Sequence, residues 1–290
     1  MWYTPNKSLF FLITLLGSLL IHNWAYSQKK ILKYKNITYL KADSISHKPK
    51  QELNIFCPEK SSELKDVFVF IHGGSWKSGS KSGYNFLGKH MANKNVVCVI
   101  IDYPLIPLAN YNEMAMDAAL AVKWVKLHIE QYGGNSNKIF VSGHSAGGHL
   151  SALISVRDEY FDTIGIANPI KGAILIDAAG VNMYGYLKIE KFKPDHYFYK
   201  VFTSNEENWK KASPLYHLHQ GMPPMLIYSG SKSYPSILNS NINLADTLRS
   251  YNAQPIFHVL KGKKHVQMMT QLFWSKNPLY NEITEFMNKQ

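Results

Sequence analysis

The segment Lys138-Ile139-Phe140-Val141-Ser142-Gly143-His144-Ser145-Ala146-Gly147 decides the fold. A short apolar run predicts a buried strand, and a Gly-x-Ser-x-Gly motif follows it, leading into a helical segment over residues 146–156. A serine on such a tight strand-to-helix turn needs glycine neighbours, because the backbone passes very close to it. Its hydroxyl would stand at the helix N-terminus, where free N–H groups and the helix dipole favour a developing negative charge. The motif in this setting predicts that Ser145 is a nucleophile.

Apolar runs of strand length recur on both sides of this motif. They alternate with helical patterns, and two earlier segments indicate an antiparallel entry hairpin. This order predicts an α/β fold, with a mostly parallel central sheet covered by helices on both faces. No repeat or linker is found, so we expect one domain over residues 28–290. The expected hairpin lies at 37–40 and 52–56, the strands at 67–71, 96–101, 139–141, 173–176, 225–228 and 256–260, and the helices at 114–132, 146–156, 242–251 and 280–287.

Residues 181–220 interrupt the alternation with many aromatic side chains and no clean periodicity, Tyr184 among them. A segment this long between two strands is usually functional. We therefore expect a cap over the strand ends. The alternative is an ordinary packed excursion whose aromatic rings only fill the core.

The first 27 residues have the pattern of a signal peptide. Lys7 precedes an apolar run from Leu9 to Ile21, and Ala25-Tyr26-Ser27 offers small residues at a cleavage site. The run is shorter than the roughly 20 residues that span a bilayer. We expect export to the periplasm or the medium after cleavage, with no stable membrane anchor.

Composition excludes several classes of protein. With 46% hydrophobic and 18% charged residues, the chain of 290 residues is too apolar for a disordered protein. The net charge is +12, but the lysines are scattered rather than gathered on one basic helix, so we expect no nucleic-acid partner. Cys57 and Cys98 are too few for a four-ligand structural zinc site, and whether they pair stays open.

A second glycine motif, His72-Gly73-Gly74-Ser75-Trp76, closes the expected strand at 67–71. Two glycines after a buried strand can be a simple turn. In the same chain as the serine motif, they are better interpreted as half of an oxyanion hole, formed by the backbone N–H of Gly73 or Gly74 together with that of Ala146.

These motifs resemble the esterase/lipase branch of the α/β-hydrolase superfamily, and most of all its acetyl- and feruloyl-esterase-like and kynurenine-formamidase-like enzymes. Besides the two motifs above, the resemblance rests on Asp102-Tyr103, Tyr132-Gly133-Gly134-Asn135 and Gly147-Gly148-His149, and it spans about residues 50–287. It implies hydrolysis of an ester or a related acyl bond through an acyl-enzyme, without a metal or a cofactor.

A serine hydroxyl needs a histidine to take its proton, and twelve histidines are present. This fold orders its triad as Ser, acid, His, which favours His265, on a loop after the last expected strand. His258 lies within that strand, and His72 is expected to brace the glycine loop. His217 and His219 are the remaining candidates for this base.

The acid departs from the family pattern. The resemblance places it after the strand at 225–228, but Gly230-Ser231-Lys232-Ser233 has a serine there. Asp177, at the end of the preceding strand, keeps the order Ser145, Asp177, His265, and we interpret it as the acid. The alternative is that Asp177 only caps a turn or binds backbone N–H groups beneath the cap. Asp246 lies too far along the next helix.

The sequence therefore predicts an exported serine esterase for small-molecule or glycan-linked esters. An amide-directed hydrolase would use the same residues, and a non-catalytic binding protein on this fold is the other alternative. Trp76, His144 and Tyr184 are the candidate substrate-binding residues. Acyl and alcohol specificity and the oligomeric state stay open.

Overall fold

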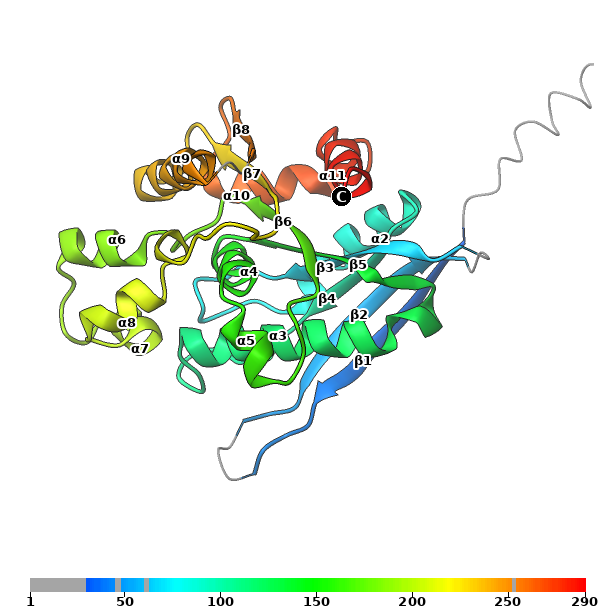
Figure 1. The fold of residues 1–290 in the computed structure, drawn as a ribbon, viewed down its shortest axis with the longest axis horizontal. Coiled ribbons are helices and arrows are strands. Elements are labelled where there is room, and N and C mark those ends of the chain that lie inside the picture. Colours follow the sequence, from blue (N-terminus) through cyan, green and yellow to red (C-terminus); the bar gives the residue numbers. More distant parts are fainter. Residues whose placement is uncertain (1–29, 45–47, 60–62, 252–253) are drawn as a thin grey trace, which may run out of the picture. The chain divides into compact units, whose positions relative to one another are not determined.

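Eight strands form the centre of the protein (Figure 1). The computed structural model describes residues 30–44, 48–59, 63–251 and 254–290, and Ile31–Gln290 form one compact unit. The strands are β1 (Ile31–Leu40), β2 (Gln51–Pro58), β3 (Lys65–Ile71), β4 (Val97–Ile101), β5 (Gly134–His144), β6 (Ile170–Ile176), β7 (Met225–Gly230) and β8 (Ile256–Leu260).

The strand order in the sheet is β1-β2-β4-β3-β5-β6-β7-β8. Strand β1 pairs antiparallel with β2, and β2 with β4, whereas every pair from β4 to β8 is parallel. The expected α/β fold with its antiparallel entry hairpin is confirmed. β5, which carries the serine motif, lies near the middle of the parallel part, so both of its faces are buried.

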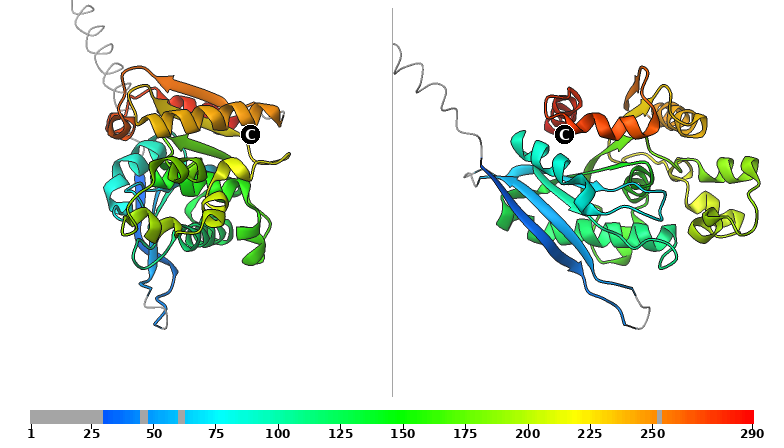
Figure 2. Two further views of the ribbon diagram at one scale, coloured as in Figure 1. Left: turned by 90° about the vertical axis from the view of Figure 1, so that its left-hand side faces the viewer. Right: turned by 180° about the vertical axis from the view of Figure 1, so that it is seen from behind.

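Helices cover both faces of the sheet (Figure 2). The side chains of β3 alternate between two cores: Val67, Val69 and Ile71 belong to one, and Phe68 and Phe70 to the other. The first core is closed by α3 (Tyr111–His128), α4 (Ala146–Val156), α5 (Glu159–Thr163) and α9 (Pro235–Ser250), and the second by α2 (Asn85–Asn93), α10 (His265–Thr270) and α11 (Leu279–Asn288).

Several boundaries differ from the expected ones. The helix expected at 114–132 is α3 followed by a 3-10 turn, Ile129–Tyr132. α9 begins at Pro235 rather than at residue 242, since a proline is well suited to the first turn of a helix even where the apolar pattern has not yet begun. α2 and α10 were not expected.

The segment at 181–220 contains α6 (Met183–Glu190), α7 (Tyr197–Phe202), α8 (Glu206–Lys211) and a 3-10 turn, Pro214–Tyr216. Both interpretations of this segment hold in part. Phe202 and Trp209 are buried in the core, whereas Tyr186 and Tyr197 line a cavity beside Ser145.

The two cysteines are buried in the two different cores, Cys57 in the first and Cys98 in the second. Their side chains therefore point to opposite faces of the sheet, which rules out a disulfide bond between them. Burial raises the pKa of the Cys98 thiol well above its usual range. The expected signal peptide lies outside the described residues.

Candidate active site

Ser145 lies on the turn between β5 and α4, and its backbone is strained (φ 56°, ψ −120°). Glycine is required on both sides. A Cβ at Gly143 would lie 2.2 Å from the carbonyl carbon of Gly147, and one at Gly147 would lie 2.0 Å from the carbonyl oxygen of Ile71. Because both residues are glycine, the backbone can approach this closely on either side of the serine and keep it in its strained geometry. These close approaches are the physical reason for the sequence motif that located it.

The carboxyl ends of neighbouring parallel strands bring three distant residues together. In the sheet register, His144 of β5 is level with Ile176 of β6, and Ile176 with Tyr228 of β7. Ser145 follows the first of these residues directly, and Asp177 follows the second. His265 follows β8 and is the first residue of α10, whereas the sequence predicted it on the loop between them.

The three side chains form a continuous hydrogen-bonded chain. His265 Nε2 lies 2.9 Å from Ser145 Oγ, and His265 Nδ1 lies 2.6 Å from Asp177 Oδ2. A carboxylate at Nδ1 keeps the proton on that nitrogen, so Nε2 is left with a lone pair that accepts from the serine hydroxyl. This is the arrangement that a general base requires.

Asp177 is fully buried and accepts hydrogen bonds from three directions. Gly230 donates its backbone N–H to Oδ1 over 3.0 Å, and Ser233 donates its hydroxyl to Oδ2, the oxygen that also faces His265. Ser233 is the residue that stands where the family pattern has the acid. Sequence reasoning flagged this position, but not its contact with Asp177.

Of the two glycine N–H groups in the loop at residues 72–76, only one is left free by the described residues to donate to an oxyanion. The N–H of Gly73 is directed at the Tyr84 hydroxyl, 3.4 Å away. The N–H groups of Gly74 and Ala146 donate to no other described residue. The choice between Gly73 and Gly74 therefore narrows to Gly74. Its φ of +133°, and a Cβ position 2.0 Å from the carbonyl oxygen of Ser78, allow only glycine there.

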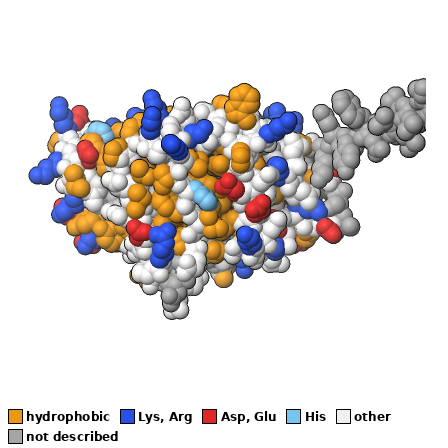
Figure 3. All heavy atoms as spheres, turned by 90° about the horizontal axis from the view of Figure 1, so that it is seen from above, with side chains coloured by type: hydrophobic (Ala, Val, Ile, Leu, Met, Phe, Trp, Pro, Cys, Tyr) orange, Lys and Arg blue, Asp and Glu red, His pale blue; other side chains and the backbone are white. Residues whose placement is uncertain are grey.

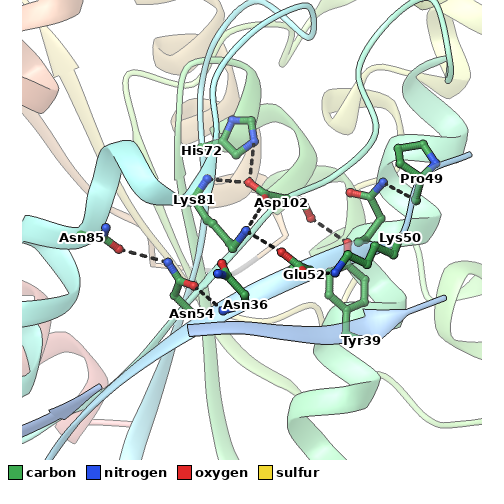
Figure 4. A network of polar contacts seen from close by, with 11 residues as sticks. Asn36, Tyr39, Pro49, Lys50, Glu52, Asn54, His72, Lys81, Asn85 and Asp102 are labelled. Carbon is green, nitrogen blue, oxygen red and sulfur yellow. Dashed lines mark hydrogen bonds and ion pairs between the residues drawn. The ribbon is translucent and has the colours of Figure 1, made fainter. Parts of the chain in front are cut away.

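Behind this loop lies a polar network that includes a buried lysine (Figure 4). Lys81 Nζ contacts Asp102 Oδ2 at 2.7 Å and Glu52 Oε2 at 3.2 Å. Burial opposes the charge on Lys81, but the two carboxylates outweigh it and raise the pKa of the lysine. His72 stacks on Tyr103, with ring centres 4.4 Å apart, and its Nε2 lies 3.9 Å from Asp102 Oδ1. His72 thus braces the loop, as expected.

His144 and Tyr184 do not line the cavity, which corrects two of the expected substrate contacts. His144 Nε2 lies 3.1 Å from the carbonyl oxygen of His265, and the two rings are 4.7 Å apart. Burial, and then the neighbouring His265, lower the pKa of His144 to about 4. His144 is therefore a neutral support for His265. Tyr184 faces away, packed against Tyr216 with centroids 5.7 Å apart.

Trp76 does line the cavity, although its ring is almost fully buried. Its indole N–H lies 3.2 Å from Nδ1 of His149, whose Nε2 lies 2.6 Å from the carbonyl oxygen of Ala212. Burial lowers the pKa of His149 to about 4, so the ring is neutral, with its proton on Nε2. The chain of contacts fixes Trp76 against the cap segment.

The cavity beside Ser145 has a volume of about 430 Å³. Its wall is mostly apolar and aromatic, as in small-molecule sites generally. Besides Ser145 and His265, the wall includes Trp76, Met183, Tyr186, Tyr197, Phe198, Tyr234 and Ile237.

The other candidate residues lie elsewhere. His217 and His219 contact the backbone carbonyl oxygens of Lys211 and Gln220. His258 is exposed on β8, with its ring packed over Tyr228, and Asp246 pairs with Arg249 on α9. Within the described residues, no cluster of His, Cys, Asp and Glu side chains is arranged to hold a metal ion.

Comparison with known proteins identifies the family. The BD-FAE family model matches residues 53–241, well over half of the chain. The chain belongs to the BD-FAE family. Its place in the esterase/lipase branch of the α/β-hydrolase superfamily is confirmed.

Two curated relatives and one solved structure illustrate the similarity. The isoprenylcysteine alpha-carbonyl methylesterase ICME of Arabidopsis thaliana is 25% identical over 83% of this chain and 60% of its own length. The probable carboxylic ester hydrolase LipM of Mycobacterium tuberculosis is 30% identical over 66% of this chain and 47% of its own. Esterase 2 of Thermogutta terrifontis is 22% identical with a TM-score of 0.72, covering 91% of this chain and 92% of that one.

The chain thus spans about half to three fifths of the length of these curated relatives. The Thermogutta enzyme has also been solved phosphoramylated by tabun. Its similarity to the present chain establishes the fold. No helix in the described part of the chain is both long and apolar enough to cross a membrane.

Proposed function

We propose that this protein is a serine hydrolase of carboxylic esters. The observation that carries the proposal is the continuous contact from Ser145 through His265 to Asp177, at 2.9 and 2.6 Å. The family membership, and relatives named as esterases and carboxylic ester hydrolases, support the same reaction class.

In the proposed mechanism, His265 takes the proton of Ser145 while the serine oxygen attacks the ester carbonyl carbon. The carbonyl oxygen becomes an oxyanion that accepts hydrogen bonds from the N–H groups of Gly74 and Ala146. Removing one such donor costs about 3 kcal/mol in other serine hydrolases. His265 then protonates the departing alcohol, and water repeats the sequence on the acyl-enzyme. Asp177 holds the imidazole and stabilises its charged form.

The cavity suits small-acyl or aryl esters, because its volume of about 430 Å³ is limited and its wall is aromatic. Esters carried on carbohydrate are included in the proposal, since flat aromatic side chains stack on sugar rings. We also propose that the protein is exported, on the strength of the leader pattern in residues 1–27.

Hydrolysis of p-nitrophenyl acetate tests the activity. We expect turnover by the parent protein and its loss in Ser145→Ala, because the variant lacks the attacking oxygen; circular dichroism should be unchanged. A fluorophosphonate probe should label the parent at Ser145 and leave the variant unlabelled. Turnover by Ser145→Ala within tenfold of the parent would exclude Ser145 as the nucleophile.

An amide-directed hydrolase and a binding protein remain the alternatives. An N-formyl aromatic amide, assayed beside the matching ester, separates the first, since both reactions would use the same residues. Absence of labelling in a folded parent protein would favour the second.

A further inference from the structure

A groove with basic side chains leads away from the catalytic cavity. A second cavity, of about 340 Å³, shares Tyr234, His265 and Val266 with the first, and Lys232 and Lys264 form part of its wall. The two cavities therefore meet at the general base.

The groove continues around α10. A third cavity, of about 600 Å³, shares Gln267 with the second, and its wall includes Lys261, Lys263 and Lys276. Amide and hydroxyl groups from Gln271, Asn277 and Thr270 complete its polar lining. We call the second and third cavities together the basic groove.

The charge in the basic groove is unbalanced. No acidic residue lines any of the three cavities in the described part of the chain. The five lysines of the groove form no ion pair with a described residue, unlike Lys48, Lys65 and Lys81 elsewhere. Figure 3 views the face that carries β8, α9, α10 and α11, and shows basic side chains along its edges, with hydrophobic and some acidic side chains nearer its middle. Unpaired lysines in a groove attract an anionic ligand.

Aromatic side chains mark both ends of this groove. Tyr234 is 62% exposed where the groove leaves the catalytic cavity, and Trp274 is 75% exposed in the third cavity. Exposed aromatic rings beside amide and hydroxyl groups suit sugar rings, which offer flat apolar faces and many hydroxyls. A lipid surface would call for a continuous apolar face, whereas amide and hydroxyl groups line the third cavity.

The groove begins at His265, the residue that would protonate the departing alcohol. An alcohol group that accepts a proton from His265 would therefore lie at the mouth of the groove. We propose that the basic groove binds the carbohydrate portion of an acidic oligosaccharide ester, with uronate carboxylates paired to the lysines. This inference rests on the proposed function for the reaction, and adds the class of substrate.

Binding to an inactive protein tests the groove separately from catalysis. In the Ser145→Ala variant, calorimetry compares an acetylated oligogalacturonate with an acetylated neutral xylo-oligosaccharide of equal length. We expect the anionic oligomer to bind at least tenfold more tightly at low salt, and the difference to shrink at about 300 mM salt, because the attraction is screened.

Adding Lys232→Gln and Lys264→Gln should weaken binding of the anionic oligomer about tenfold, since each exposed ion pair contributes modestly. The matched control adds Lys89→Gln and Lys171→Gln, which remove the same charge from exposed lysines outside the groove; binding should stay within twofold. Thermal melts verify that all variants fold.

Three results would overturn the proposal. The first is equal affinity for the anionic and neutral oligomers. The second is a similar loss in both lysine pairs, which would show an effect of net charge alone. Binding to vesicles with anionic phospholipid, lost on the groove substitutions and without any oligosaccharide affinity, would instead identify a lipid surface. If the parent protein does not hydrolyse p-nitrophenyl acetate but the anionic oligomer binds in the groove, the proposed esterase function is refuted, whereas the proposed binding of an acidic oligosaccharide still holds.

Discussion

Replacing Asp177 by Asn tests the least expected member of the site. Gly230 donates its N–H to Oδ1 over 3.0 Å, so the amide oxygen of an asparagine must take that place. The amide NH₂ then faces His265 Nδ1, which lies 2.6 Å from the present Oδ2. Nδ1 has to accept rather than donate, the imidazole proton moves to Nε2, and Nε2 can no longer take the proton of Ser145. The Ser233 hydroxyl can rotate to accept from the amide, so the fold should survive.

The equivalent change in a serine protease of another fold lowers turnover about 10⁴-fold through the same change of tautomer. For Asp177→Asn we expect a loss of about 10² to 10⁴ in kcat, which corresponds to about 2.7 to 5.4 kcal/mol in the activation barrier. The assay is kcat on p-nitrophenyl acetate, with thermal melts to verify folding. The control is Asp246→Asn, because Asp246 is exposed and pairs only with Arg249 on its own helix.

A rescue variant sharpens this test. Ser233 Oγ and His265 Nδ1 both contact Asp177 Oδ2, so a carboxylate at position 233 would stand beside the imidazole. Ser233→Asp in the Asp177→Asn background should recover at least tenfold of the lost turnover. If Asp177→Asn alone runs within threefold of the parent, Asp177 is structural and the reasoning is refuted.

Three further predictions concern the cavity wall, the core and the leader. Tyr186→Ala should raise KM for an aryl ester at least fivefold, whereas Tyr184→Ala should not, since only Tyr186 lines the cavity; equal effects on KM would contradict the assigned wall. Burial raises the pKa of Asp117 to about 6, so its ionisation destabilises the fold increasingly as the pH rises from about 4 to above 6. Asp117→Asn should therefore raise the free energy of unfolding by up to about 3 kcal/mol at pH 8 and by little at pH 4, as measured by urea denaturation; a gain equal at both pH values would argue against it. When the protein is expressed with its own leader in an exporting bacterium, intact mass should show a mature chain that begins near Gln28, and a retained leader would overturn the export proposal.

The sheet could be predicted because its strands are buried on both faces. In a chain that also contains helical patterns, a short continuous apolar run such as residues 67–71 indicates a strand that helices cover on both sides. Helix α2 was missed because it is only nine residues long and its N-terminus carries no capping side chain, although Leu87, Met91 and Ala92 are buried in the second core. Its position is set by packing against the second core, which local sequence does not reveal.

The candidate site divides in the same way. Ser145 and its two glycines lie within five consecutive residues, so a short sequence motif was enough to locate them. The support of Asp177 by Gly230 and Ser233 joins residues more than 50 positions apart, and no local pattern encodes it. Tyr186 lines the cavity in place of the predicted Tyr184, and the cause is helix geometry. On a helix, residues two positions apart point to nearly opposite sides, and Met183 and Tyr186, three apart, share the side that faces the cavity.

The contact between Ser233 and Asp177 also bears on how such a site changes during evolution. Ser233, just beyond the end of β7, contacts the same oxygen of Asp177 that faces His265 Nδ1. A carboxylate at position 233 would therefore stand close to the same imidazole, so the acid is not tied to one strand. A chain with carboxylates at both positions would hold two acids close together, one of which would keep its proton. Replacing either acid by a hydroxyl would then leave one charged partner for the histidine. Two single substitutions are enough to move the acid from one strand to the next, with a carboxylate beside the histidine at every stage.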